Sequence, residues 1–550
     1  MADQEQDQDE TGRNVARASA WMALGTIVSR ITGFVRLLMI AVAIGTSLDA
    51  DLFNNANTIP NAMYILVAGG VFNVVLVPQL VRAMQRDDDE GDAYAQRIMS
   101  LALAVLVGAT LLLTALVPLI MHVVFTEKLF VPRFAEQQHD AQVLMWLCMP
   151  QVFFYGAFVL VGQVLNARGR FGPMMWAPIV NNVAAVAMLG SYIAVYGSSN
   201  GADGFTTGQI LLLGVGSTAG IVLQTLVLVP FLRATGFRFR LRFDLRGVGL
   251  GHTLRLGVWT LLFILANQVA FIVVQRLGTS GTVAGARTGE DASGSAVYEI
   301  GFLVSQMPHG VITVSLATAV IPSLSAWCHR GEYDRVRLEL GRTLRVALVV
   351  IVPLAVAVGT LGHEAADLLG AFGDLAASTA VIGRTIAAFS LAMVTFTIHY
   401  VMLRGFYADE DTRTPFWIQL VIAATNIVVA VVLVGRADPS HVAAALALAY
   451  GLAYTVGSIL SVTLLSRRLG RVVDAEMVRF VVRLALVSAV TVLTILGVRW
   501  LLDEQLAGGA TASLVVLLVA GGAGAATYVV LATLVRLREL PYLVSSLRRR

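Results

Sequence analysis

The protein is a chain of 550 residues that are 57% hydrophobic and only 13% charged, with a formal net charge of +4. Soluble domains contain about 45–50% apolar and about 25% charged residues, so this composition excludes a cytosolic enzyme and a nucleic-acid-binding protein. The mean hydropathy of +0.76 is an average over the whole chain, and it predicts a protein with many membrane spans.

The chain begins with an acidic and polar segment, from Met1 to Glu10, that does not have the character of a signal peptide. Residues 1–19 are therefore expected to form a disordered cytoplasmic tail. The two cysteines, Cys148 and Cys328, lie in or beside apolar runs, which favours buried thiols over a disulfide or a metal site.

Long apolar runs follow one another along the rest of the chain, and strand patterns are absent. A bilayer core about 30 Å thick needs about 20 apolar residues per helix. The pattern predicts an all-α polytopic membrane protein with about fourteen transmembrane helices. In chain order they are expected at 20–46, 58–81, 98–125, 141–166, 174–197, 208–232, 250–275, 297–327, 343–360, 380–403, 415–435, 440–466, 480–498 and 511–535.

Arginine is distributed unevenly between the connections of these spans. The even-numbered connections are rich in it, for example residues 233–246 and 330–342, whereas 47–57, 198–207 and 361–379 contain no Lys or Arg. Cytoplasmic loops accumulate Lys and Arg. The alternation predicts a multi-pass protein of the cytoplasmic (inner) membrane with both termini in the cytoplasm.

Two pairs of spans that are six spans apart resemble each other. The fourth and tenth spans end in related sequences at Leu165 and Leu403, each followed by proline and asparagine, and the second and eighth spans correspond more loosely. Chance is the alternative, because Pro and Asn often flank membrane helices. A six-plus-six repeat is typical of transporters, although channels can also be built from repeats.

This repeat predicts two six-helix lobes around a central cavity. The N-terminal lobe is expected over 20–237 and the C-terminal lobe over 238–472, while 473–550 would hold two additional transmembrane helices and a basic tail.

Two arginines, Arg30 and Arg36, interrupt the first predicted span. A charged side chain inside a membrane is costly unless it faces a cavity or a partner. Snorkelling to the interface is the alternative, and it is harder for Arg36, which lies deeper in the apolar run. Guanidinium groups match phosphate oxygens with paired donors, so the pair suits an anionic headgroup such as a diphosphate.

A polar segment precedes the second span, with Asp51 followed by Asn54, Asn55 and Asn57. The position of Asp51 is as compatible with a helix cap as with a functional role.

The eighth span carries Glu299, Gln306, His309 and Thr313 at spacings of seven, three and four residues. This spacing predicts one polar helix face that lines a wetted cavity. The other histidines are scattered, so the spacing does not support a metal site at His309. No catalytic constellation or phosphate-binding loop is present, so the chain is not expected to be an enzyme.

Several segments together resemble the MurJ/MviN family of lipid II flippases, which belongs to the multidrug/oligosaccharidyl-lipid/polysaccharide exporter superfamily. The resemblance covers about residues 20–540. The opening block that carries it consists of Ser29-Arg30, Gly33 to Arg36, Asp51, Pro60-Asn61, Gly70 to Asn73 and Val77-Pro78. The later segments are Pro308 to Val311, Ile321 to Ser325, Gly405 to Tyr407 and Thr412 to Pro415.

The resemblance implies a central cationic cavity that opens alternately to the two sides of the membrane. It implies transport of the undecaprenyl-diphosphate-linked peptidoglycan precursor, lipid II, from the inner to the outer leaflet, with functional roles for Arg30, Arg36 and Asp51. Membrane lipids and the cell-wall synthesis machinery are the expected further partners. No cofactor and no nucleic acid are expected, and a coupling ion or the membrane potential stays open as the energy source. The expected substrate-binding residues are Arg30, Arg36, Asp51, Asn54, Asn61, Glu299, Gln306 and His309.

This chain departs from the family pattern at four positions. Leu37 stands where an acid commonly follows the second arginine, Tyr64 and Ile65 stand where basic residues are usual, and the arginine of the eighth span is replaced near Leu303. The replacements of basic residues lower the positive charge expected in the cavity. They leave two alternatives open: an exporter of another lipid-linked polysaccharide or a cation-coupled drug antiporter, and a non-transporting scaffold for cell-wall machinery.

Overall fold

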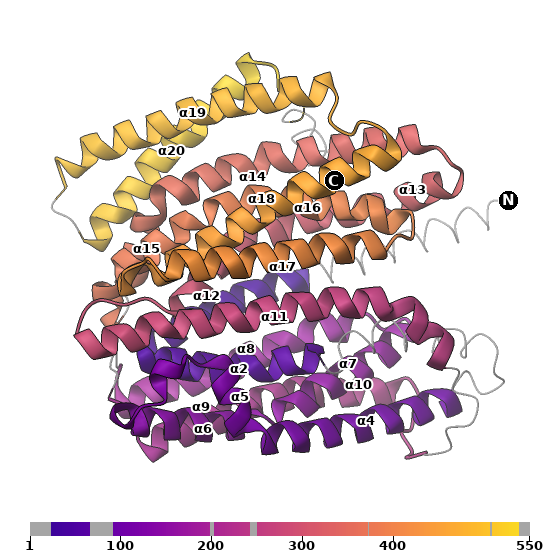
Figure 1. The fold of residues 1–550 in the computed structure, drawn as a ribbon, viewed down its shortest axis with the longest axis vertical. Helices are drawn as coiled ribbons and strands as arrows, with labels where there is room; N and C mark the ends of the chain where they lie inside the picture. Colours follow the sequence, from indigo (N-terminus) through magenta and orange to yellow (C-terminus); the bar gives the residue numbers. More distant parts are fainter. Residues whose placement is uncertain are drawn as a thin grey trace.

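The computed structural model describes residues 24–66, 92–198, 203–242, 250–371, 373–506, 509–537 and 539, without the side chains of 250–257 and 373–374. The described residues form long helices that run side by side, and no strand occurs among them (Figure 1). The predicted all-α membrane fold is confirmed. Thirteen helices of the described part are long and apolar enough to cross a membrane.

The N-terminal helix group begins with the first described helix, Leu24–Ile44. It continues with α2 (Leu48–Tyr64), α4 (Asp92–Ala115), α5 (Val117–Val124), α6 (Ala135–Cys148), α7 (Gln151–Ala167), α8 (Gly172–Tyr196), α9 (Thr207–Leu226) and α10 (Leu228–Ala234). Two 3-10 turns, η3 (Glu127–Leu129) and η4 (Pro132–Phe134), connect α5 to α6.

The long helix α11 (Leu250–Thr288) lies between this group and the next in Figure 1. The C-terminal helix group comprises α12 (Ser295–Pro308), the π turn η5 (His309–Thr313), α13 (Val314–His329), α14 (Tyr333–Gly370), α15 (Thr379–Ala388), α16 (Ser390–Ala408), α17 (Arg413–Val434) and α18 (Val442–Leu469). The 3-10 turns η6 (Gly373–Ser378) and η7 (Pro439–His441) belong to its connections. Two last helices, α19 (Ala475–Asp503) and α20 (Ala510–Leu534), pack on each other and on α14.

Thirteen of the predicted spans correspond to helices that meet the membrane-spanning criteria, and the predicted second span is the exception. Residues 67–81 of that span lie outside the described residues, so the count of fourteen stays a prediction. The predicted start at residue 58 is wrong, because α2 already begins at Leu48. The polar residues that lower the local hydropathy, Asp49, Asp51 and Asn55, are buried against other helices.

The predicted end of the seventh span at residue 275 is also wrong, since α11 continues to Thr288. Its polar residues Gln275, Thr279 and Thr282 are buried as well. In both helices the protein, and not lipid, surrounds the polar residues, so hydropathy underestimates the helix length.

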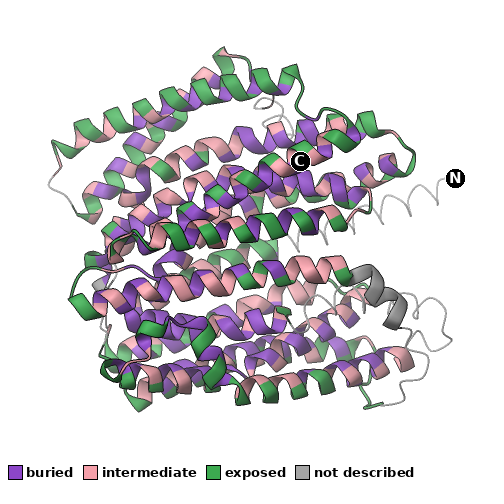
Figure 2. Ribbon diagram, in the orientation of Figure 1, coloured by how far each residue is buried: buried purple, intermediate pink, exposed green. Residues whose placement is uncertain are grey.

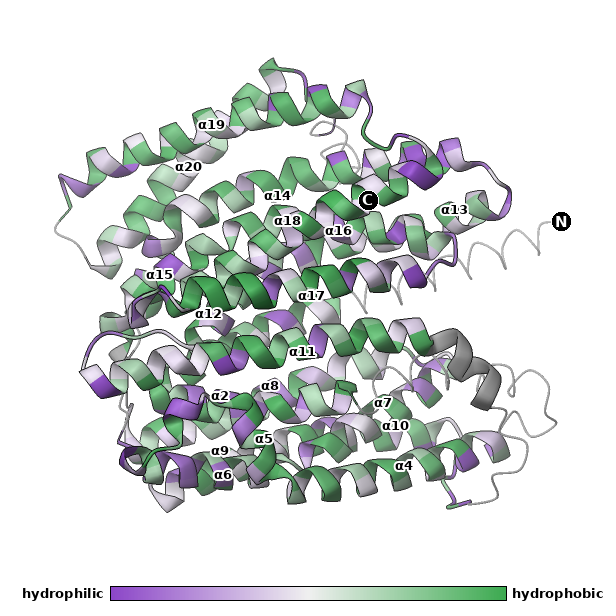
Figure 3. Ribbon diagram, viewed as in Figure 1, coloured by the Kyte–Doolittle hydropathy of each residue, from purple (hydrophilic) through white to green (hydrophobic). Residues whose placement is uncertain are grey.

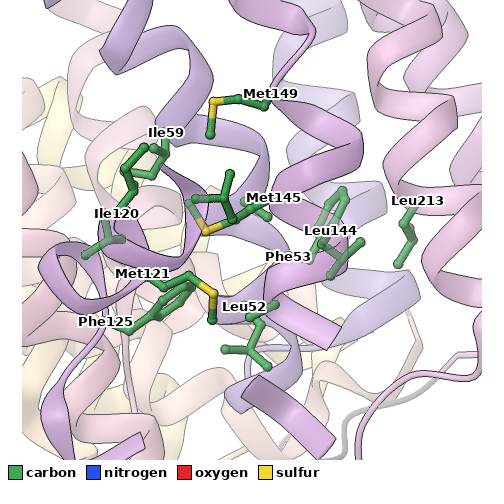
Figure 4. Packing of buried hydrophobic residues seen from close by; sticks show 14 of the residues in the cluster. Leu52, Phe53, Ile59, Ile120, Met121, Phe125, Leu144, Met145, Met149 and Leu213 are labelled. Carbon is green, nitrogen blue, oxygen red and sulfur yellow. The ribbon is translucent and has the colours of Figure 1, made fainter. Parts of the chain in front are cut away.

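Each helix group has its own apolar core. Figure 4 shows α2, α5, α6 and α9 contributing to the N-terminal core through residues such as Phe53, Met121, Met145 and Leu213. Separate clusters lie between α14, α16 and α18 and between α12, α15 and α18. Cys148 and Cys328 are free and buried, as predicted.

Apolar side chains also cover much of the outside of the molecule. Figure 2 shows exposed residues along the outer faces of the peripheral helices, and Figure 3 shows that these helices are hydrophobic while hydrophilic residues gather at their ends. Large exposed apolar residues such as Leu111, Leu493 and Leu518 occur within long helices. A surface of this kind is stable against lipid tails and not against water. The boundaries predicted for the lobes and the tail stay predictions.

Candidate functional site

A cavity of about 590 Å³ lies within the molecule, between the first described helix, α2 and α8 on one side and α11, α12 and α16 to α18 on the other. Polar and aromatic side chains form most of its wall. It is lined by Gly33, Arg36, Leu37, Ile40, Asn54, Asn57, Thr58, Asn182, Asn267, Gln268, Ala270, Phe271, Val274, Tyr298, Glu299, Phe302, Leu303, Phe396, Asn426, Tyr450 and Tyr454.

The charges in the wall are Arg36 and Glu299, one from each helix group. Arg36 forms no hydrogen bond or ion pair with any side chain of the described part. The carboxylate of Glu299 accepts a hydrogen bond from Gln275 Nε2 at 2.8 Å. With one cation and one anion the described lining is close to neutral, which is less cationic than the family resemblance implies and agrees with the lower positive charge expected for this chain.

Two of the family departures lie in this lining, and the one near Leu303 replaces a cationic side chain. Leu37 and Leu303 both line the cavity, and each is apolar. Tyr64 is turned away from it and stacks on Tyr155, with ring centroids 6.1 Å apart.

Amide side chains hold the cavity wall together. Asn182 Nδ2 donates to Ser29 O and to Thr32 Oγ1, both at 3.1 Å, and so fixes the first described helix against α8. Gln268 Nε2 donates to Ala62 O at 2.9 Å and connects α11 to α2. These residues were not predicted as site residues. Asn182 lies in the Pro-Asn segment of the internal repeat, and that position was the only signal in the sequence.

The wall formed by the C-terminal group is aromatic. Tyr298 and Phe302 of α12 contact Phe389, and Phe302 meets Tyr450 of α18 edge to face, with ring centroids 5.6 Å apart. Phe396 packs edge to face on Tyr454. The resulting wall combines rigid apolar surface with hydroxyl groups, which is typical of pockets that bind organic ligands.

Arg30 lies outside the cavity lining, on the first described helix. Its guanidinium sits directly over Gly310 in the π turn, where a built Cβ would be 2.7 Å from Arg30 Cζ. The absence of a side chain at Gly310 therefore allows Arg30 to lie against the C-terminal group.

Asp51 belongs to α2 but caps the N-terminus of α12. Its Oδ1 accepts a hydrogen bond from the Ala296 amide at 2.7 Å and its Oδ2 accepts from the Ser295 amide at 3.1 Å, at the N-terminus of α12. The Thr282 hydroxyl of α11 donates to Oδ2 at 2.8 Å. Because Asp51 belongs to α2, this cap connects the two helix groups.

The predicted polar face of the eighth span is not continuous. Glu299 lines the cavity, but His309 and Thr313 turn toward α16, where both lie within hydrogen-bonding distance of Thr397 Oγ1, at 3.3 and 3.4 Å. The π turn at His309–Thr313 shifts the helical register, so a spacing of 3.6 residues does not hold across it. Gln306 does not line the cavity either.

Of the predicted residues on α2, Asn54 lines the cavity and Asn61 does not. The structure thus brings Arg36, Asn54 and Glu299 together. Arg30, Asp51, Asn61, Gln306 and His309 lie outside the lining.

The two ends of the molecule differ in how the helix groups meet. The end with Ser47, Gly204 and Ser378, on the left of Figure 1, carries residues of the connections without Lys or Arg and is here named the arginine-poor end. At this end Thr46 donates to Ser378 Oγ at 2.7 Å, Asp51 accepts from the N-terminus of α12, and Asn55 Nδ2 donates to Thr279 of α11 and Ser295 of α12. Arg276 of α11 donates to the backbone carbonyl of Val123 in α5, and Arg287 of α11 donates to that of Lys128 in η3. The helix groups are therefore closed against each other at this end.

The arginine-rich end carries ion pairs within each helix group. Arg168 pairs with Asp92 in the N-terminal group, and Arg468 pairs with Asp409 and Asp411 in the C-terminal group. Burial alone would raise the pKa of Asp411, but hydrogen bonds from Thr414 and the charge of Arg468 outweigh it and lower this pKa below its ordinary value. These pairs fix the loops without connecting one group to the other.

Together, a helical fold with apolar outer faces and a polar cavity closed at one end define a membrane transporter. The fold is similar to that of a multidrug resistance MATE family transporter of the MOP superfamily in an inward-facing conformation, with a TM-score of 0.64 at 12% identity over 82% of this chain and 98% of that one.

The chain belongs to the lipid II flippase MurJ family, whose model matches residues 40–520. A probable lipid II flippase MurJ from Rhizobium meliloti (strain 1021) is 28% identical over 424 residues, which are 76% of this chain and 75% of that protein. Another from Haemophilus influenzae is 24% identical over 73% of this chain and 77% of its own length. The structure of a lipid II flippase MurJ in an inward closed conformation matches with a TM-score of 0.71 and 16% identity, over 93% of this chain and 98% of that one.

Proposed function

We propose that this protein moves lipid II, the undecaprenyl-diphosphate-linked peptidoglycan precursor, from the inner to the outer leaflet of the cytoplasmic membrane by alternating access. Membership of the lipid II flippase MurJ family supports the substrate. The single observation that carries the chemistry is Arg36, a guanidinium without an ion pair in the described part of the chain, in the wall of an intramembrane cavity. Such a group is retained at a cost of several kcal/mol only where a charged ligand or water compensates it.

In this proposal the diphosphate binds at Arg36, and Arg30 attracts it on the way into the cavity. Guanidinium groups offer phosphate two parallel N–H donors and stay charged at every physiological pH. Asn54 and Glu299 would bind sugar or peptide groups of the headgroup. The aromatic wall of Tyr298, Phe302 and the neighbouring rings provides flat apolar surface for the same headgroup.

The arginine-rich end is the cytoplasmic side in this proposal, as the positive-inside rule predicts, and both termini are cytoplasmic. The closed, arginine-poor end then faces outward. Transport requires the contacts of Thr46, Asp51 and Asn55 to break after the substrate has entered, so that the same cavity opens outward. In this proposal the protein would also bind the cell-wall synthesis machinery as a further partner.

Replacement of Arg36 tests the proposal most directly. The chain is expressed in place of a host's essential flippase, and lipid-linked precursor on the outer leaflet is measured. We expect Arg36→Ala to reduce the amount of precursor on the outer leaflet at least about ten-fold, because losing one charge-assisted contact costs about 1.5–3 kcal/mol. Arg36→Lys should be intermediate, because it keeps the charge but not the paired donors.

Arg240, an exposed arginine outside the cavity, provides the matched control. Arg240→Ala should support growth and precursor exposure like the unmodified chain. Full precursor exposure by Arg36→Ala would contradict a binding role for Arg36 in this cavity. Absence of precursor exposure even with the unmodified chain would favour a non-transporting scaffold.

The nearly neutral lining supports the alternative that the protein transports another substrate. That substrate would be a different lipid-linked polysaccharide, or a drug exchanged for a cation. Glu299 balances Arg36, and Leu37 and Leu303 are apolar. Under this alternative, depletion of the protein in its own host leaves lipid II exposure unchanged. Under the proposed function, depletion leads to accumulation of the precursor in the inner leaflet, to cell-shape defects and to lysis.

A further inference from the structure

A pair of buried carboxylates lies outside the cavity, at the arginine-poor end of the N-terminal helix group. Asp49, in the first turn of α2, is 5% exposed, and Asp140, on α6, is 3% exposed. Neither takes part in the substrate binding proposed above. A buried carboxylate is costly unless it is paired, hydrogen-bonded or protonated.

The two carboxylates converge on one short backbone segment. The Gly204 amide donates to Asp49 Oδ2 at 3.3 Å, and the next amide, that of Phe205, donates to Asp140 Oδ2 at 2.7 Å. Gly204 has a φ of +83°, and a Cβ built on it would be 2.9 Å from Asp140 Oδ2. The close approach of both acids to this segment therefore depends on glycine.

These hydrogen bonds leave the pair incompletely satisfied. Asp49 Oδ1 is buried and has no hydrogen-bond partner among the described residues. Neither acid forms an ion pair with an arginine or lysine of the described part, so no cation in these helices compensates two negative charges. Two ionised carboxylates in this arrangement repel each other, and a single proton removes the repulsion and turns one acid into a donor.

The charged groups around the pair are mostly acidic and exposed. Asp203 acts on Asp49 from the loop before α9, and Glu136 and His139 act on Asp140 from α6. Arg133 of η4, which packs on α6, donates to backbone carbonyls of α11. On α2 itself Asp51 is bound to α12, while α7 and α9, which also pack on α2, contain no charged residue. The nearest bases of α11, Arg276 and Arg287, donate to backbone carbonyls of the segment 122–128, and Glu299 of α12 faces the cavity.

The segment that carries Asp49 also carries the contacts that close this end. Thr46 contacts Ser378, Asp49 contacts the loop at Gly204, and Asp51 caps α12, all within six consecutive residues. A change in charge at Asp49 therefore acts on the start of α2, through which both contacts to the C-terminal group are made.

We propose that Asp49 and Asp140 share one proton, which is exchanged with the arginine-poor face past Glu136, His139 and Asp203, and that its loss loosens the contacts closing this end. Protonation forms one O–H bond on a carboxylate and releases no other group. The assignment of this face to the outside rests on the proposed function, whereas the proton site and its effect on closure do not.

Closure can be measured without transport by crosslinking Thr46→Cys to Ser378→Cys, since the two hydroxyl oxygens are 2.7 Å apart. The purified full-length chain, with Cys148 and Cys328 replaced by serine, is oxidised over a range of pH. We expect the crosslinked fraction to fall several-fold as the pH rises and the shared proton is lost. Asp49→Asn, which imitates the protonated acid, should hold the crosslinked fraction high at alkaline pH. Asp334→Asn, at an exposed acid of α14 at the arginine-rich end, should keep the wild-type pH profile.

Infrared difference spectroscopy on the same samples provides the second measurement. A carboxylic acid band that titrates in the wild type should be lost in Asp49→Asn and Asp140→Asn. An unchanged band in both variants, or an unchanged pH profile of crosslinking in Asp49→Asn, would overturn the proposal. So would a crosslinked fraction that follows sodium concentration and not pH. Because neither readout uses lipid II, failure of the proposed transport activity would leave both results interpretable.

Discussion

At the scale of single residues, the placement of two arginines decides how the first helix contributes to function. Arg36 faces the cavity, whereas Arg30 lies over the backbone of Gly310 in the π turn. The two positions differ by six residues in the sequence and have different surroundings, so substitutions at them have different consequences.

Gly310→Ala is expected to displace the Arg30 guanidinium, because the added Cβ would be 2.7 Å from Cζ. The side chain is long and flexible, so it moves and the fold is retained. If Arg30 guides the substrate, precursor exposure should fall, by up to about a hundred-fold, because a misplacement of about 1 Å of a positioning group can cost that much. Precursor exposure and the melting temperature are measured together.

Gly190→Ala is the matched control, since a Cβ at this helical glycine of α8 meets nothing within 4 Å. It should leave both measurements unchanged. Normal precursor exposure with Gly310→Ala would show that the position of Arg30 does not matter.

At the scale of elements, the most informative contact is the cap that α2 provides for α12. Helix N-termini are usually capped by the residue just before them. In α12 that residue is Gly294, which has no side chain, and Asp51 takes its role from another helix. A built Cβ at Gly294 would be 1.9 Å from Asp51 Oδ2, so the glycine leaves the space that the carboxylate occupies.

Asp51→Ala should therefore weaken closure of the arginine-poor end. Loss of an N-cap costs about 0.5–2 kcal/mol, so the crosslinked fraction of the cysteine pair at 46 and 378 should decrease. Asp51→Asn should be intermediate, because asparagine caps a helix but carries no charge.

Asp474 offers a control with the same chemistry within one helix group. It caps its own helix, α19, by accepting a hydrogen bond from the Met477 amide at 2.8 Å. Asp474→Ala should lower the melting temperature without changing the crosslinked fraction. An equal loss of crosslinking in both alanine variants would mean that the cap at α12 has no special role in closure.

The last two helices depend on close packing at one glycine. A Cβ at Gly524 of α20 would be 2.5 Å from Ile495 Cγ1 of α19. Gly524→Ala should therefore separate α19 from α20 and destabilise the protein by about 1–3 kcal/mol. Gly522→Ala, at a position where a Cβ meets nothing within 4 Å, should not destabilise it. Equal melting temperatures for the two variants would contradict the packing argument.

At the scale of the whole molecule, the helix groups are joined at one end and enclose a cavity. If transport requires this end to open, an oxidised cysteine pair at Thr46 and Ser378 should abolish precursor exposure, and reduction should restore it. Each single cysteine variant is the control and should be active under oxidation. Precursor exposure by the fully crosslinked protein would exclude opening between these residues.

The sequence alone was sufficient for the class of protein and for most of its helices. Membrane spans depend on local hydropathy, because each helix satisfies its own backbone hydrogen bonds whatever its neighbours are. The free-energy cost of a charge inside the membrane likewise identifies Arg36 as a candidate functional residue without knowledge of its surroundings. The motifs around Arg36 and Asp51 indicated the family, to which the chain belongs.

Only the tertiary structure decided which polar residues meet. The start of α2 and the end of α11 were missed because their polar residues are buried by each other. The π turn at His309–Thr313 removed His309 from the cavity, and Asp51 capped a helix that lies far from it in sequence. Cavity lining, capping across helix groups and net cavity charge depend on contacts between distant segments, and the spacing of residues along one helix does not determine them.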